Sequence, residues 1–236
     1  MIFDWGFLIG AAQIVRTRRP HSPGSQSKIA NLKSKIEMHS TRLDPQTLLS
    51  AYAQGVFPMA DRDGAIRLYT ADPRGVIPLE AFHVPHTLAQ LVRKPPERGG
   101  FEVRINHDFE ATMRGCMEDR EDGTWINPEL VRAYARLHDL GYAHSVEAWR
   151  DGKLAGGLYG VSLGAAFFGE SMFHRERDAS KVALVHLVNR LRERQFELLD
   201  SQATTAHLRK FGCIDIPARE YLLRLRRAIQ MERTFD

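Results

Sequence analysis

The spacing of hydrophobic and polar positions divides most of the chain into short strands and amphipathic helices. Residues 44–55 and 127–141 each begin with an N-cap residue followed by proline and end with glycine, which predicts two capped helices. Residues 178–195 carry Val and Leu around most of the helical circumference, which predicts a well-buried helix capped near Asp178. Further helices are expected at 83–94, 107–119 and 218–230, and short strands and turns at 56–79 and 101–106.

The segment 143–202 has the strongest pattern. Asp151-Gly152 separates two strand-like runs and predicts a tight β-hairpin, and the next run continues as a strand to Phe173. The buried helix and the apolar run at 196–202 then complete a strand–helix–strand unit, expected to be right-handed with parallel strands. A small mixed N-terminal part followed by this arrangement is compatible with a GNAT-like acyltransferase fold.

The composition is that of an ordinary globular protein. The 236 residues are 43% hydrophobic and 26% charged, which is enough for one large domain or two small ones. No run approaches the ~18 apolar residues of a membrane helix. Cys116 and Cys213 form neither a disulfide framework nor a zinc-binding spacing. We therefore expect a cytoplasmic protein with no membrane association and no metal.

Residues 1–37 differ from the rest of the chain. They carry six Lys and Arg against two acidic residues, which equals the whole chain's net charge of +4, so the remainder has no bulk basic field. Asp4 lies where a secretory signal requires positive charge, and the stretch after residue 15 is polar with proline and glycine. We interpret 1–37 as a disordered extension or a mis-set start before Met38, whose deletion would leave activity intact. An arm that touches a membrane or RNA is the alternative.

Polar residues interrupt two apolar runs. Asp200 and Gln202 end the run at 196–202, and residues two apart on a strand lie on the same face. Glu170 lies within another apolar strand, where a carboxylate is costly unless it is paired. The three residues form either a satisfied polar network or a working site, and Glu170 is either structural or a ligand for a cationic substrate. A serine nucleophile at Ser171 is disfavoured, because "GESMF" lacks the second glycine of that motif.

Other motifs are weaker. The histidines include no HExxH or other metal-binding pair, and the glycines between 156 and 164 lie in a strand instead of between a strand and a helix, so they are no dinucleotide fingerprint. Strand glycines mark a bulge or a close approach of backbone or ligand. Scattered aromatic residues are usually core residues, and stacking on a nucleic-acid base is the minority interpretation. The aromatic candidates are Tyr69, Trp125, Tyr134 and Phe167.

Taken together, these segments resemble the leucyl/phenylalanyl-tRNA–protein transferase family. The matching blocks run in family order from Thr41 to Tyr221, and "GESMF" followed by "DASK" and then D-x-Q is a specific signature. The other blocks are "AYAQGVFPM", "DPRGVIPL", "FHV", "TWI", "AYARLHDLGYAHSVEAW", "GGLYGVSLG" and "LLDSQATTAHLRKFG". The resemblance implies an α+β fold with a small mixed N-terminal subdomain followed by a GNAT-like acyltransferase domain, which we place at 38–80 and 81–236.

The resemblance also implies the reaction. Enzymes of this family move Leu or Phe, and Met less well, from aminoacyl-tRNA to a protein whose first residue is Arg or Lys, and the product enters the N-degron degradation pathway. No ATP, metal or coenzyme A is needed, because the tRNA ester is already activated. The implied partners are the 3′ end of the charged tRNA and the acceptor protein, and a cytoplasmic monomer is expected.

The family's site residues fall on positions of this chain. By resemblance, Gln202 holds the attacking amine and Asp200 positions Gln202 or the amine, while Glu170 and Asp200 supply negative charge for a cationic acceptor. Because an amide is a very poor base, the acceptor of the amine proton stays open, with the 2′-hydroxyl of the terminal adenosine as one candidate. Trp125 and a residue of "LYTADPR", in which Tyr69 replaces a common Trp, are implied to hold that adenosine. The implied aminoacyl pocket consists of Leu158, Met172, Leu184, Leu187, Leu191 and Leu199.

Two alternatives stay open. An acetyl-CoA-dependent N-acetyltransferase of the GNAT type would need a glycine-rich loop for the pyrophosphate, and residues 174–181, "HRERDASK", contain no glycine. A non-catalytic RNA-binding module would give no role to Glu170, Asp200 and Gln202 and would favour a basic body, which the charge balance does not provide.

Overall fold

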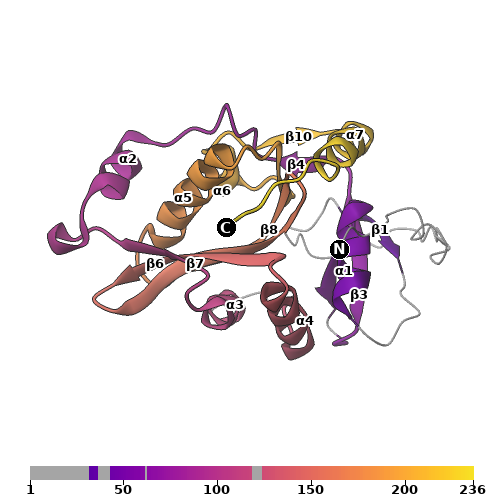
Figure 1. Ribbon diagram of the computed structural model, residues 1–236, viewed down its shortest axis with the longest axis horizontal. Helices are drawn as coiled ribbons and strands as arrows, with labels where there is room; N and C mark the ends of the chain where they lie inside the picture. Colours follow the sequence, from indigo (N-terminus) through magenta and orange to yellow (C-terminus); the bar gives the residue numbers. More distant parts are fainter. Residues whose placement is uncertain (1–31, 37–42, 62, 119–123) are drawn as a thin grey trace, which may run out of the picture.

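Two β-sheets organise the chain, a small one of three strands and a large one of seven (Figure 1). The computed structural model describes residues 32–36, 43–61, 63–118 and 124–236. The helices of this described part are too short or too polar to cross a membrane.

The small sheet has the strand order β1-β3-β2 and is antiparallel. Its strands are β1 (Leu32–Ile36), β2 (Phe57–Ala60) and β3 (Ile66–Ala71). The helix α1 (Pro45–Ala53) precedes β2, and Asp44 caps it by accepting a hydrogen bond of 2.8 Å from the main-chain N–H of Thr47. The predicted cap and the proline at the first helical position are therefore confirmed.

The large sheet has the order β10-β4-β9-β8-β7-β6-β5, and only β8 and β9 run parallel among its pairs within the described residues. A crossover through α5 (Ala179–Glu193) joins these two strands, as predicted. The strands are β4 (Arg74–Val76), β5 (Glu102–Ile105), β6 (Ala143–Arg150), β7 (Lys153–Leu163), β8 (Ala166–His174), β9 (Leu198–Gln202) and β10 (Ile214–Ile216).

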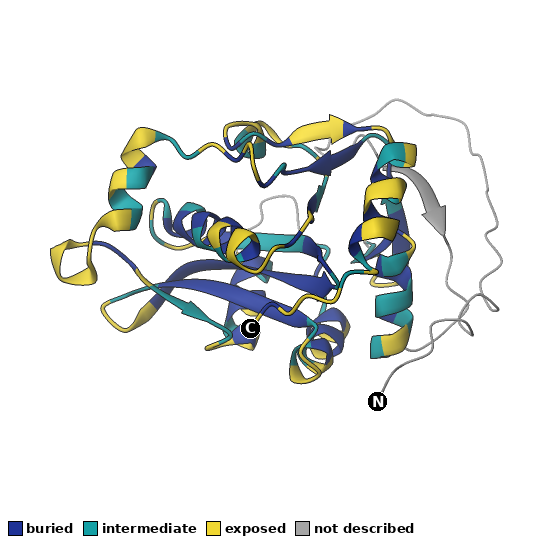
Figure 2. Cartoon of the chain, turned by 45° about the horizontal axis from the view of Figure 1, so that its top comes forward, coloured by how far each residue is buried: buried dark blue, intermediate teal, exposed yellow. Residues whose placement is uncertain are grey.

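Helices cover both faces of the large sheet (Figures 1 and 2). The buried α5 packs on one face against β6, β7 and β8, with α2 (His86–Arg93) beside it, and α3 (Phe109–Met117) and α4 (Pro128–Asp139) pack on the other. The short α6 (Ala206–Arg209) follows β9, and α7 (Ala218–Ala228) follows β10. A single 3₁₀ turn, Pro96–Arg98, precedes β5. The central strand β7 is almost wholly buried between two hydrophobic clusters.

Tight packing on β7 explains its glycines. A Cβ at Gly160 would lie 2.3 Å from the carbonyl oxygen of Phe168, and one at Gly156 would lie 2.7 Å from the Cβ of Ala179. These glycines therefore admit neighbouring strand and helix atoms instead of a ligand. The hairpin prediction is confirmed, since Asp151 and Gly152 both have positive φ, 49° and 71°, at the turn between β6 and β7.

Three features were not predicted or differ from a prediction. Residues Leu32–Ile36, inside the predicted extension, form β1 and pair with β3, while the rest of that extension lies outside the described residues. The chain leaves the small sheet after Ala71 and enters the large sheet at Arg74, and the division at residue 80 stays a prediction. Asp178 precedes α5 in a left-handed conformation, φ 69°, and its side chain binds Lys181 instead of capping the helix.

Candidate active site

A cavity of about 560 Å³ lies where the large sheet meets the small one. Strands β8 and β9 are paired only from Ala166 to Phe168 on β8. Beyond that point, β8 residues from Gly169 to Met172 line the cavity, together with β9 residues from Leu199, which is still paired with β8, to Gln202. Phe57 and Met59 of β2 line it from the small sheet. The opening between two strand ends thus provides a concave site with few polar groups.

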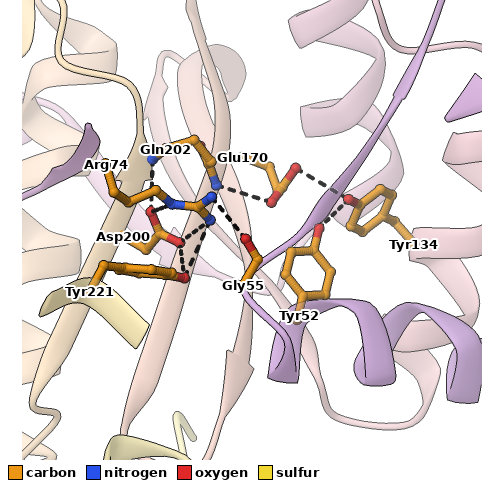
Figure 3. Close-up of polar contacts among 8 residues, drawn as sticks. All are labelled: Tyr52, Gly55, Arg74, Tyr134, Glu170, Asp200, Gln202 and Tyr221. Atoms are coloured by element: carbon orange, nitrogen blue, oxygen red, sulfur yellow. Dashed lines mark hydrogen bonds and ion pairs between the residues drawn. The ribbon is translucent and has the colours of Figure 1, made fainter. Parts of the chain in front are cut away.

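Asp200 forms the buried polar centre beside this cavity (Figure 3). Its Oδ1 accepts from the Nε of Arg74 at 2.9 Å and from the main-chain N–H of Gln202 at 2.8 Å. Its Oδ2 accepts from the Nη2 of Arg74 at 2.6 Å and from the hydroxyl of Tyr221 at 2.7 Å. A carboxylate has about four lone-pair positions, so Asp200 is fully satisfied by protein donors.

Arg74 has further contacts that fix its position. Its Nη1 donates to the carbonyl of Gly55 at 3.0 Å, in the turn between α1 and β2. Its guanidinium lies over the rings of Phe57 and Tyr221, 4.9 and 4.4 Å from their centres. A buried arginine is stable only with such partners, so Arg74 and Asp200 are mutually dependent.

Glu170 stands at the cavity wall and belongs to a second polar group (Figure 3). Its Oε2 accepts from the hydroxyl of Tyr134 at 3.2 Å, and the Tyr134 hydroxyl is itself bonded to that of Tyr52. Its Oε1 lies 3.4 Å from the Nε2 of Gln202. Burial raises the pKa of Glu170 to about 7, against the opposing effect of hydrogen bonds from the two tyrosines. Glu170 is therefore divided between its acid and carboxylate forms near neutral pH.

At the end of β9, the side chains of Asp200 and Gln202 do not lie side by side on one face, as they would on a regular strand. Gln202 has φ 55°, a left-handed conformation that costs about 1–3 kcal/mol for a residue other than glycine. As a result Asp200 contacts the main-chain N–H of Gln202, and the side-chain amide of Gln202 faces Glu170 (Figure 3). The predicted trio is brought together, with Asp200 behind Gln202 instead of beside it.

The structure places most of the predicted pocket residues around the cavity. Trp125 lines it together with five apolar residues, Leu158, Met172, Leu184, Leu187 and Leu199. Leu191 does not line it and is fully buried in the hydrophobic cluster on the α5 side of the sheet.

The other predicted aromatic residues also lie outside the cavity lining. Tyr69 directs its hydroxyl to Asp61, and Phe167 stacks on Phe235, 5.2 Å between ring centres. Tyr134 reaches the site through its hydrogen bond to Glu170 and packs edge-on against Tyr159, which lines the cavity.

Three site residues were missed from the sequence. Arg74, Tyr52 and Tyr221 hold the two carboxylates, and all three are buried. One signal was available, because a buried Asp200 requires a cation and Arg74 lies in the quoted block "DPRGVIPL". The described residues contain no cluster of His, Cys, Asp or Glu suited to a metal ion.

The sequence of this chain is similar to proteins of one known family. The model of the family "Leucyl/phenylalanyl-tRNA protein transferase" matches residues 76–226, and the model of its N-terminal domain matches residues 41–72. A leucyl/phenylalanyl-tRNA–protein transferase of Rubrobacter xylanophilus is 53% identical over 195 residues, covering 82% of this chain and 99% of the relative. The enzyme of the same name from Akkermansia muciniphila is 50% identical, covering 80% and 97%, and that from Maricaulis maris is 52% identical, covering 81% and 88%.

Solved structures give weaker similarity. A ribosomal-protein-alanine N-acetyltransferase from Brucella melitensis biovar Abortus 2308 has 17% identity and a TM-score of 0.34 over 47% of this chain and 85% of that one. The C-terminal domain of a putative lysylphosphatidylglycerol synthetase from Agrobacterium fabrum has 14% identity and a TM-score of 0.43, covering 77% and 68%. The structure of L-PGS from Bacillus licheniformis has 10% identity and a TM-score of 0.40, covering 69% and 52%.

Proposed function

The chain belongs to the leucyl/phenylalanyl-tRNA–protein transferase family, and we propose that the cavity between β8 and β9 is where it joins a leucyl or phenylalanyl group to an acceptor protein. The donor is the aminoacyl ester at the 3′ end of a charged tRNA, with the methionyl ester a poorer donor. The acceptor is a protein whose first residue is Arg or Lys, and the product is a new peptide bond at its N-terminus. Addition of Leu or Phe in this way marks the acceptor for the N-degron pathway.

The chemistry is aminolysis of an activated ester. An α-amino group has a pKa of about 7.7–8.0, so a useful fraction is neutral and nucleophilic near pH 7. The protein then has to align the amine with the ester carbonyl and provide a destination for one proton. The groups at the cavity suit these two tasks without an added energy source.

The apolar part of the cavity receives the aminoacyl side chain. Leu and Met residues unbranched at Cβ surround it, and such side chains adapt to ligands of different shape. One methylene more or less in an apolar pocket changes binding by only about 1–3 kcal/mol. A pocket of this kind accepts Leu, Phe and Met with modest discrimination.

Gln202 and Asp200 divide the work of orientation. The Nε2 of Gln202 faces Glu170, which leaves its amide oxygen to accept a hydrogen bond from the attacking amine. Asp200 acts as a positioning residue, since it accepts a hydrogen bond from the main-chain N–H of Gln202 and has no unoccupied lone pair for a substrate. Trp125 offers an aromatic face to the terminal adenosine at the same cavity.

The observation that carries this proposal is the position of Gln202 and Glu170 on the wall of an apolar cavity. A transfer assay tests it. Purified protein should move labelled Leu or Phe from charged tRNA to a peptide beginning with Arg, without coenzyme A or ATP. Failure of transfer by a folded protein that still binds the tRNA would favour an RNA-binding module, and acetylation with acetyl-CoA would favour an acetyltransferase.

A further inference from the structure

Aminolysis releases a proton from the attacking nitrogen, and the cavity offers few groups to take it. Among the described residues that line it, three have side chains that ordinarily titrate below pH 7: Glu170, Asp200 and His207. The amide of Gln202 is not a base of useful strength. The proton acceptor therefore has to be the one of these three residues that has a free lone pair near Gln202.

Asp200 fails this test. Each of its two oxygens already accepts two hydrogen bonds, from Arg74, Tyr221 and the main chain of Gln202. Protonating it would break part of a fully buried ion pair with Arg74. Asp200 thus has no free lone pair to offer the amine proton.

His207 fails for a different reason. It lies on α6, where its ring packs edge-on against Phe211 at 5.3 Å between centres. Within the described residues, none of the hydrogen bonds made by Glu170, Asp200 or Gln202 involves it. Burial, with Lys181 and Lys210 nearby, lowers its pKa and makes it a weaker base.

We propose that Glu170 is the general base of the transfer and takes the proton that the attacking amine loses. This inference rests on the proposed function of the cavity. Within the described part of the chain, Glu170 Oε1 has a long hydrogen bond of 3.4 Å to Gln202 Nε2, so an amine held by the Gln202 amide oxygen lies beside an oxygen with spare capacity.

The step balances without another reactant. The nitrogen lone pair forms a bond to the ester carbonyl carbon, and one amine proton passes to Glu170 Oε1. The tetrahedral intermediate then expels the ribose 3′-oxygen, breaking the carbon–oxygen bond. Glu170 returns the same proton to that oxygen and is regenerated as a carboxylate.

The surroundings of Glu170 suit this cycle. Tyr52 on α1, Tyr134 on α4, Asp200 on β9 and Arg74 on β4 are the titratable groups that act on it. Its pKa of about 7 is near that of an α-amino group, so proton transfer in either direction is nearly balanced in free energy. Tyr134 and Tyr52 both form hydrogen bonds with Glu170, and their hydroxyls are bonded to each other, so the two tyrosines together fix the orientation of the carboxylate.

The test uses E170Q, in which the amide oxygen can still accept from Tyr134. Single-turnover transfer from leucyl-tRNA to saturating Arg-start peptide should fall about 10²- to 10⁴-fold, with little change in tRNA affinity. Below pH 7, the slope of log rate against pH should approach about two in the wild type, from the amine and Glu170, and about one in E170Q. E102Q, on the distant edge strand β5, is the matched control and should keep the wild-type profile.

Two outcomes would overturn the inference. One is a wild-type rate and slope in E170Q. The other is a rise in the KM for Arg-start peptide alone, which would make Glu170 a ligand for the cationic side chain.

Tyr134→Phe gives a second readout, since losing its hydrogen bond should raise the pKa of Glu170 and move the rate profile to higher pH; an unmoved profile also contradicts the proposal. An inactive wild type would instead remove the proposed function itself.

Discussion

Arg74 and Asp200 meet in a two-pronged ion pair, with bonds of 2.9 and 2.6 Å, although 126 residues separate them in sequence. Both side chains are buried beside the cavity, and the carboxylate also fixes the main chain of Gln202. Stability and the proposed catalytic geometry therefore depend on the same pair, and variants are needed that separate the two.

Asp200→Ala should lose both activity and stability. Removing one partner of a buried pair leaves the other uncompensated, so the free energy of unfolding should fall by about 3–5 kcal/mol. Chemical denaturation monitored by circular dichroism measures this. The double variant Arg74→Met/Asp200→Leu should recover much of the stability but not the transfer rate, because Gln202 stays unsupported. Recovery of transfer in the double variant would show that Asp200 has no positioning role.

Glu170→Gln should stabilise the fold at alkaline pH. Burial raises the pKa of Glu170 to about 7, above its ordinary value, so its carboxylate form destabilises the folded state. The destabilisation is absent below the unfolded pKa, grows as pH rises from there to about 7, and is complete above it. Gln removes it, so melting at pH 8 should occur at higher temperature in the variant, and at pH 4 the two proteins should melt alike. A lower melting temperature at pH 8 would contradict this account.

Leu184→Phe should change donor preference. A larger side chain in the apolar part of the cavity leaves less room for a phenylalanyl group than for a leucyl group. We expect kcat/KM with phenylalanyl-tRNA to fall about tenfold or more relative to leucyl-tRNA. Leu223→Phe is the control, since Leu223 on α7 is 60% exposed and away from the cavity. An unchanged ratio in Leu184→Phe would place the aminoacyl group elsewhere.

Trp125→Ala should weaken donor binding. Loss of one base-stacking ring costs about 1–3 kcal/mol, so KM for aminoacyl-tRNA should rise roughly 5- to 150-fold, while Trp125→Phe keeps most of the affinity. The same loss should appear with a minimal aminoacyl-adenosine donor, which lacks the rest of the tRNA. If only the full tRNA is affected, Trp125 contacts another part of the nucleic acid.

Two truncations of the N-terminal segment should differ in melting temperature. Deleting residues 1–31 is expected to preserve transfer and stability. Deleting 1–37 also removes β1, which pairs with β3 in the small sheet, so it should lower the melting temperature. The expectation from sequence, that transfer activity survives deletion of 1–37, is not changed by this. Equal melting temperatures for the two truncations would show that β1 does not stabilise the small sheet.

Local patterns predicted much of the fold, because their causes are local. The Asp151-Gly152 turn, the caps at Asp44 and Asn127, and the crossover to β9 each follow from a few adjacent residues. The contact between Tyr52 and Tyr134, 82 residues apart, has no such local signature. It depends on how α1 docks against α4, which periodicity does not specify.

The site was predictable by residue type more than by orientation. Leu184 and Leu191 belong to one helix with apolar residues on nearly all sides, so the sequence does not tell which face lines a cavity. Tyr69 has the aromatic ring that an adenosine contact requires, but its hydroxyl is bonded to Asp61 on the β2–β3 connection, and this bond fixes the direction of the side chain. Gln202 turned toward Glu170 because the end of β9 adopts a left-handed conformation.

The bond from Arg74 to the carbonyl of Gly55 has a consequence for newly made enzyme. Gly55 belongs to the α1–β2 turn, while Asp200 is synthesised 126 residues after Arg74. Until these two distant segments have met around the Arg74 guanidinium, Gln202 lacks its support. Nascent or misassembled copies should therefore spare charged tRNA that the ribosome needs, and only a completed molecule consumes it.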